Sequence, residues 1–223
     1  MKLSACRLAE QIAAILRKDF LIGIRRRATF AAMMFFALTT VACLSLSMGG
    51  VSLAPNFSAA LLWLVIFFAA CAGISGTFDD EANSGTLTTL KLYADIQAIL
   101  FGKMIYVFLS LIMLAIFIVP IFVILFDVDV TSGGVLIATI FLGLIGLSAA
   151  GTLTAAITVS ATVKGGLFSI LLFPITLPIF LPAIALTETA LTGTGFDADL
   201  LIVMTIFDAI LITASSILFD YLD

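Results

Sequence analysis

Acidic side chains are the residues of this chain best suited to chemistry, and two places hold the most suggestive ones. Asp79, Asp80 and Glu81 follow one another at the start of a polar stretch, whereas Asp208 stands alone in an apolar run. The chain has no histidine, so it lacks the commonest metal ligand and the best side chain for proton transfer near neutral pH. Its three cysteines form no CxxC pair, and neither GxxxxGK[ST] nor GxSxG occurs. The sequence therefore predicts no enzyme, no metal site and no resident cofactor, and nucleotide chemistry would have to come from a partner chain.

The composition places these residues in a membrane protein. Hydrophobic residues make up 63% of the 223 residues and charged residues 11%, whereas average proteins have about 45–50% and about 25%. Too few polar side chains remain to cover a surface that faces water. A soluble domain, a disordered chain, a secreted disulfide scaffold and a nucleic-acid-binding protein are all excluded.

Six apolar runs are each long enough for a helix that crosses the bilayer, which needs about 20 residues. Strands of a membrane barrel would instead alternate apolar and polar residues. The sequence thus predicts an all-α integral membrane protein, in which residues 1–28 form a cytoplasmic interfacial helix and residues 29–223 a six-helix transmembrane domain. The predicted spans lie at about 29–49, 57–77, 104–126, 135–161, 165–187 and 200–219.

The basic residues predict the orientation of these spans. All ten lysines and arginines precede the first span or fall between spans two and three or four and five. The predicted outer loops hold five acids and no cation. By the positive-inside rule, both termini are expected in the cytoplasm.

Residues before the first span have helical periodicity. Their apolar members recur at intervals of three or four positions, and the charged residues fall mainly on other faces. This pattern predicts an amphipathic helix on the inner membrane surface, either an anchor on anionic lipids or an elbow that transmits movement into the first span. The apolar members are Leu8, Ile12, Ile15, Leu16, Phe20 and Ile24.

The predicted inner loop, residues 78–103, is the one substantial polar segment between spans on the inner side. Its three consecutive acids cannot lie in hydrocarbon and are expected to face water or a partner. Gly85 permits a tight turn, and Ser84 or Thr86 can cap a short helix that begins at Leu87. Such a helix suits a groove on a soluble partner, and a solvated hairpin is the alternative.

Two features of the predicted spans concern helix packing and bending. Pro174, Pro178 and Pro182 recur every four residues on one face of span five, either as a bendable element near the outer half of a path or as a static kink. Span four contains a stripe of small residues, which indicates close helix packing rather than a transport path. They are Gly143, Gly146, Ala150, Gly151, Thr154, Ala155 and Thr158.

Asp208 lies near mid-depth in span six, where an exposed carboxylate is unfavourable. It is a candidate functional acid, in a proton relay or in a contact with a partner. The alternative is a protonated aspartate that is hydrogen-bonded to neighbouring threonine or serine side chains.

Two motifs resemble a known family. Residues 78–87 (FDDEANSGTL) resemble the coupling segment of ABC-2-type exporter permeases, and more specifically that of the CcmB family, the membrane permease of the cytochrome c maturation haem exporter. Residues 163–182 (VKGGLFSILLFPITLPIFLP) resemble that family's basic-glycine-glycine entry, here Lys164, Gly165 and Gly166, into a proline-bearing fifth helix. Chain length, six spans and inner termini agree with the resemblance.

The resemblance implies a permease of the inner (plasma) membrane that lacks its own ATPase. A CcmA-like ATP-binding subunit would dock on the inner loop, and CcmC-like and CcmD-like membrane proteins would complete the complex. Haem would be the cargo, delivered to a periplasmic CcmE-like chaperone, or the permease would instead release loaded chaperone. The residues expected at the ATPase contact are Asp79, Asp80, Glu81, Gly85, Thr86 and Leu87.

The missing histidine bears on that cargo, because haem iron is usually held by His, Met, Cys or Tyr. The chain is expected to supply no haem ligand, and its seven methionines are expected to pack rather than ligate. Other hypotheses are an ABC-2 permease for a drug or a lipid-linked glycan and an assembly scaffold that transports nothing. A self-powered secondary transporter is disfavoured because polar coupling sites within the spans are scarce.

Overall fold

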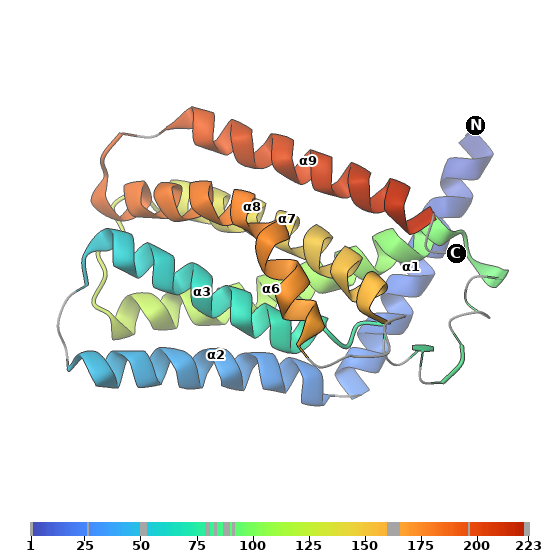
Figure 1. Cartoon of the computed structure of the whole chain (residues 1–223), viewed down its shortest axis with the longest axis horizontal. Helices are drawn as coiled ribbons and strands as arrows, with labels where there is room; N and C mark the ends of the chain where they lie inside the picture. The colour runs from blue at the N-terminus through green and yellow to red at the C-terminus, as the bar shows by residue number, and fades with distance from the viewer. Residues whose placement is uncertain are drawn as a thin grey trace.

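The chain folds into a bundle of long helices, seen in a computed structural model (Figure 1). The structure describes residues 2–25, 27–49, 53–78, 81–82, 84–86, 90, 92–159, 166–195 and 197–220. Within these ranges no strand occurs, and six helices are long and apolar enough to cross a membrane. The predicted all-α fold with six spans is therefore confirmed. The long helices are α1 (Lys2–Arg25), α2 (Arg27–Met48), α3 (Pro55–Ile74), α6 (Ile96–Leu125), α7 (Gly133–Val159), α8 (Leu167–Thr192) and α9 (Ala198–Asp220).

Two helices extend past the limits that charged residues suggested. α6 begins at Ile96 rather than near residue 104, so Lys103 lies within the helix and not in the inner loop. α8 continues to Thr192, so Glu188 lies in the helix and not beyond its end. Lysine and glutamate are good helix formers. A helix can therefore continue through such a residue wherever its charged side chain has polar partners. The predicted boundaries at these two residues were wrong for that reason.

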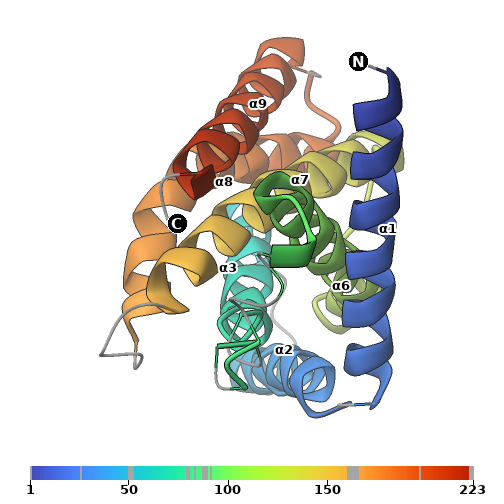
Figure 2. The same cartoon turned by 90° about the vertical axis from the view of Figure 1, so that its right-hand side faces the viewer.

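α1 lies across one end of the six-helix bundle, and both ends of the chain lie at this same end (Figures 1 and 2). We call it the α1 end. The buried side chain of Ile15 packs on α6 at Gly102, where a Cβ atom would lie 2.8 Å from Ile15 Cγ2. Farther along the same helix, Phe20, Leu21 and Ile24 are exposed. The predicted N-terminal helix is confirmed as a helix, and its place on a membrane surface stays a prediction.

Other helices pack closely on α7, because its small residues let side chains approach its backbone. The Trp63 ring of α3 lies directly over Gly143, and its Nε1 donates a hydrogen bond to Thr187 Oγ1 of α8 at 3.0 Å. Farther along, Ile74 of α3 lies over Gly151, where a Cβ atom would be 3.0 Å from Ile74 Cδ1. All seven predicted small-residue positions are buried. The prediction that this stripe packs against other helices is confirmed.

α8 changes direction sharply along its length (Figure 1). Its three internal prolines, Pro174, Pro178 and Pro182, each remove a backbone donor and crowd the preceding turn, which is the usual cause of such a bend. Pro174 and Pro178 are exposed, whereas Pro182 is buried, so the three do not share one environment. Gly166 precedes the helix with φ +78°, a left-handed conformation that favours glycine. The other two residues of the predicted helix entry, Lys164 and Gly165, lie outside the described residues.

Candidate functional site

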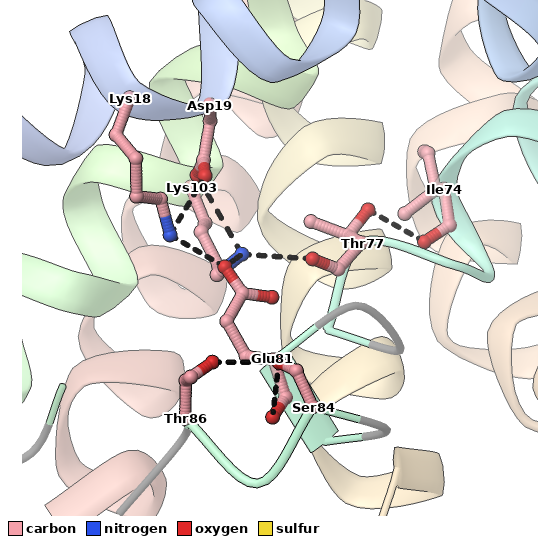
Figure 3. Close-up of polar contacts among 8 residues, drawn as sticks. All are labelled: Lys18, Asp19, Ile74, Thr77, Glu81, Ser84, Thr86 and Lys103. Atoms are coloured by element: carbon pink, nitrogen blue, oxygen red, sulfur yellow. Dashed lines mark hydrogen bonds and ion pairs between the residues drawn. The ribbon is translucent and has the colours of Figure 1, made fainter. Parts of the chain in front are cut away.

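Four charged side chains meet at the α1 end of the bundle (Figure 3). Lys18 and Asp19 come from α1, Lys103 comes from α6, and Glu81 comes from the connecting segment, residues 75–95. Glu81 Oε1 lies 2.6 Å from Lys18 Nζ and 2.9 Å from Lys103 Nζ. Asp19 completes the group, with Oδ1 3.0 Å from Lys18 Nζ and Oδ2 3.5 Å from Lys103 Nζ. We call these four residues the charge cluster, whose formal charges sum to zero.

The charge cluster is largely withdrawn from solvent. Lys103 is 1% exposed, Glu81 6% and Asp19 7%, whereas the Lys18 side chain is 35% exposed. Lys103 Nζ also donates to the carbonyl oxygen of Thr77 at 2.8 Å and lies 4.7 Å from the centre of the Phe78 ring. Buried charges persist when they are paired and hydrogen-bonded, and removing one partner is strongly destabilising. The cluster therefore fixes the connecting segment at Glu81 to both α1 and α6.

The expectation that Glu81 faces water or a partner is wrong. Its carboxylate is turned into the protein and bridges two lysines. The prediction from the sequence places Lys103 in a loop and therefore leaves Glu81 without a buried partner. One signal was available, because Asp19 occupies the apolar stripe of α1, four positions after the buried Ile15. An acid on a buried helix face predicts a buried cation opposite it.

The residues just after Glu81 form an exposed turn. Ser84, Gly85 and Thr86 are exposed, and Gly85 has φ +68°, as the predicted tight turn requires. The backbone N–H of Thr86 donates to the carbonyl oxygen of Glu81 at 3.0 Å, and the Ser84 and Thr86 hydroxyls lie 2.8 Å apart. The exposed turn is thus joined directly to the buried anchor at Glu81. The other predicted contact residues, Asp79, Asp80 and Leu87, lie outside the described residues.

The charge cluster shifts the ionisation of two of its members. Burial disfavours the carboxylate of Glu81, but the attraction of Lys103 and the hydrogen bond from Lys18 outweigh burial and lower the pKa of Glu81 below 4.5. Burial likewise disfavours the ammonium of Lys18, yet the carboxylates of Glu81 and Asp19 outweigh it and raise the pKa of Lys18 above 10.5. Both groups are therefore charged at neutral pH.

Low pH should destabilise the contacts that Glu81 makes at the α1 end. Because the pKa of Glu81 is lowered by folding, its ionisation stabilises the fold above pH 4.5, and this contribution is lost as the pH falls through the lowered value. The raised pKa of Lys18 acts in the opposite direction, and its contribution is lost only above pH 10.5. We expect the unfolding temperature in detergent to fall below pH 4.5. The Glu81→Gln variant should show a smaller fall over the same range, and an equal fall would exclude Glu81 as its source.

Asp208 lies apart from the charge cluster, in the middle of α9. It is 4% exposed, and its Oδ1 lies over Gly146 of α7, next to Ile179 of α8. Among the described residues, neither carboxylate oxygen has a hydrogen-bond partner. The alternative that threonine or serine neighbours hydrogen-bond this carboxyl group therefore has no support in the described part of the chain. The packing of α9 on α7 and α8 holds the group in place instead.

The described residues include no group of three or more His, Cys, Asp or Glu side chains that could hold a metal ion. The site is instead structural and electrostatic: a buried charge cluster behind an exposed turn, at one end of a six-span bundle. Such an arrangement can transmit a movement of the turn to α1 and α6.

Comparisons with known proteins identify the family. The family model described as CcmB protein matches residues 10–218, which run from within α1 to the last turn of α9. A search of the curated proteins found no match. The matched region includes the charge cluster, the exposed turn and Asp208. The chain therefore belongs to the CcmB family and is a multi-pass membrane component of haem export for cytochrome c maturation.

Proposed function

We propose that this chain is the membrane subunit of an ABC-type haem exporter complex and converts ATP hydrolysis by a separate subunit into movement of its own helices. The observation that carries the proposal is the direct link between the exposed turn and the charge cluster. Glu81 lies three residues before Ser84 and is held by Lys18 of α1 and Lys103 of α6. A force on the exposed turn would therefore reach both helices instead of being absorbed by a loose loop.

The partner at the turn would be a CcmA-like ATP-binding subunit. Asp79 and Asp80, which precede Glu81 in the sequence, would supply the acids of this contact, since Glu81 is buried. Acids at the edge of such a contact would pair with basic groups of the ATPase, which favours fast and correctly oriented association more than affinity. The α1 end would then be cytoplasmic, in agreement with the positive-inside rule, and the membrane would be the inner membrane.

Cross-linking can test the contact at the turn. In a variant whose three native cysteines are replaced by alanine, Thr86→Cys places a thiol in the exposed turn. Thr194→Cys is the matched control, because Thr194 is an exposed threonine in the loop between α8 and α9. We expect a short bifunctional reagent to join the Thr86→Cys chain, and not the Thr194→Cys chain, to the ATP-binding subunit in membranes. Equal yields from both positions would contradict the proposed contact.

The proposed function leaves two alternatives for how haem is handled, and one experiment distinguishes them. The chain would act with CcmC-like and CcmD-like membrane proteins and would either deliver haem to a CcmE-like chaperone or release the loaded chaperone. Deletion of the gene should abolish holocytochrome c. Chaperone that accumulates with haem bound would favour release, whereas chaperone that stays empty would favour delivery. Normal holocytochrome c after deletion would contradict both forms and favour another cargo or a dispensable scaffold.

Haem would be a substrate of the complex rather than a cofactor held by this chain. The chain has no histidine, and partner subunits would supply axial ligands. The purified chain, free of partners, should not bind one haem per chain with a low-spin absorption spectrum. Such a spectrum would overturn this part of the proposal.

Asp208→Asn tests the intramembrane acid, because it keeps the side-chain shape and removes the ability to ionise. No described donor pairs with the carboxylate, so the unfolding temperature should not fall. We propose that the carboxyl group serves the transport cycle as a proton carrier or a partner contact, and we expect holocytochrome c to decrease. Unchanged holocytochrome c would exclude that role.

A further inference from the structure

One narrow stripe of side chains holds α9 to the rest of the bundle. The helix lies at the edge of the bundle, along α7 and α8 (Figures 1 and 2). Its buried residues recur every three or four positions on one face, and its other described side chains are half-buried or exposed. The carboxyl group of Asp208 therefore lies in the middle of the contact that joins α9 to the bundle. The buried residues are Met204, Asp208, Leu211, Ser215 and Phe219.

The Asp208 carboxyl group is enclosed between α7 and α8. Gly146 of α7 leaves the space for it, because a Cβ atom at that position would overlap Asp208 Oδ1 and would lie 2.5 Å from Ile179 Cδ1 of α8. Both carboxylate oxygens are buried, and none of the described residues donates a hydrogen bond to them. An ionised carboxylate that has neither a donor nor a counter-ion is strongly unfavourable in such a place. The observed packing therefore fits the neutral carboxyl group.

No opposite charge faces this carboxyl group from the two helices that enclose it. α7 has no charged or titratable side chain over its described length. α8 has only Glu188, an acid nine residues beyond Ile179 and thus about 13 Å farther along the helix. The other two acids of α9, Asp199 and Asp220, stand near its two ends. The described parts of α7, α8 and α9 thus offer Asp208 no counter-ion.

α6 also packs on α9, and it carries two titratable side chains, Lys103 and Tyr106. Lys103 is held in the charge cluster against the ring of Phe78, which contacts Phe219 near the C-terminal end of α9. Phe219 lies eleven residues from Asp208, which is about 16 Å along the helix. Tyr106 faces α1, where its hydroxyl lies against the helix backbone. Neither side chain of α6 therefore pairs with Asp208.

We propose that Asp208 is a proton-dependent switch: its neutral carboxyl group keeps α9 packed on α7 and α8, and loss of the proton separates α9 from them. Because both oxygens are enclosed, the proton can leave only when α9 moves away. The closed arrangement therefore binds the proton and the open one releases it, so a rise in pH favours the open arrangement. This inference goes beyond the role in the transport cycle proposed above, and it holds or fails in the isolated chain whatever that role is.

Alkylation of an engineered cysteine in the purified chain in detergent tests the switch. In a variant whose native cysteines are replaced by alanine, Met204→Cys places a thiol in the buried stripe one turn before Asp208. Its rate of reaction with N-ethylmaleimide is compared with and without Asp208→Asn at the same pH, so that the ionisation of the thiol itself cancels. The two rates should be equal at about pH 5, and at about pH 9 the thiol should react about tenfold faster where Asp208 is retained. Equal rates at both pH values would overturn the proposal.

Two further positions keep this comparison decisive. Leu211→Cys gives a second reporter in the buried stripe, on the other side of Asp208, if Met204→Cys does not fold. Thr213→Cys is the matched control, since Thr213 lies on the exposed side of α9, and its rate should not depend on Asp208→Asn. The same rate ratio at Thr213→Cys would mean that the charge of Asp208 acts on the reagent and not on the packing of α9, and it would also overturn the proposal.

Gly146→Ala tests the place of the carboxyl group against α7. The added methyl group should displace Asp208 and speed the alkylation of Met204→Cys already at about pH 5, whereas Gly134→Ala should not, because a Cβ atom there has nothing within 4 Å. Adding Asp208→Ala to Gly146→Ala should restore slow alkylation, since loss of the carboxyl group leaves room for the methyl group. Alkylation that stays fast in this double variant would assign the overlap to Ile179 and contradict the proposed contact.

Discussion

Replacing Lys103 by methionine should lower the free energy of unfolding of the protein in detergent by about 3–5 kcal/mol, the usual effect of removing one partner from a buried ion pair. Lys103 is 1% exposed and donates to Glu81 Oε1 and to the Thr77 carbonyl oxygen. Methionine fills a similar volume but leaves Glu81 and Asp19 to share Lys18, a single cation that is partly exposed. Chemical denaturation followed by circular dichroism measures the loss.

Two further variants separate this explanation from a general sensitivity to mutation. Arg17→Met removes an exposed cation from α1 and should change the free energy of unfolding little. Glu81→Leu combined with Lys103→Met removes one acid and one base, keeps the remaining pair of Lys18 and Asp19, and should recover much of the loss. If the double variant were as unstable as both single variants added together, the charges of Glu81 and Lys103 would not be coupled.

Gly143→Ala should also destabilise the protein, by about 1–3 kcal/mol, the usual effect of overpacking. A Cβ atom at Gly143 would overlap the ring of Trp63, which is 1% exposed and hydrogen-bonded to Thr187. The ring has little freedom to move, so α3 and α7 would have to separate. Thermal unfolding in detergent measures the effect, and the near-ultraviolet circular dichroism of Trp63, the single tryptophan, reports the local change.

Gly134→Ala is the matched control for this prediction. Gly134 lies in the first turn of the same helix, and a Cβ atom there would have nothing within 4 Å. Its substitution should leave the unfolding temperature unchanged or slightly higher, because alanine favours helix. Trp63→Phe in the Gly143→Ala background should recover part of the loss, since the smaller ring leaves room for the methyl group. Equal effects at Gly143 and Gly134 would contradict the close approach of α3 to α7.

The spans and the family could be predicted from the sequence because both depend on local information. Long apolar runs determine which segments can cross a membrane, whatever their neighbours are. The small residues of α7 were also predictable, because a stripe without large side chains favours close approach of other helices. The resemblance carried by residues 78–87 and 163–182 led to the family that the match over residues 10–218 confirms.

The charge cluster could not be predicted in the same way, because it joins residues far apart in the sequence. Lys18 and Glu81 are 63 positions apart, and Glu81 and Lys103 are 22 apart. From the sequence alone each charge is expected to need water, which predicts a loop position for Lys103 and an external contact for Glu81. Only the packing of α1 across the end of the bundle supplies partners that let these charges be buried.

In the mechanism we propose, the charge cluster carries movement from the exposed turn to α1 and α6. The most direct test is the amount of holocytochrome c formed per ATP hydrolysed by the complete complex that contains the Glu81→Leu and Lys103→Met double variant. The ATP-binding subunit should still bind and hydrolyse ATP, because the exposed turn remains. The yield per ATP should fall about tenfold, as expected when a coupling free energy of about 1–3 kcal/mol is lost. An unchanged yield per ATP from a stable double variant would contradict this mechanism.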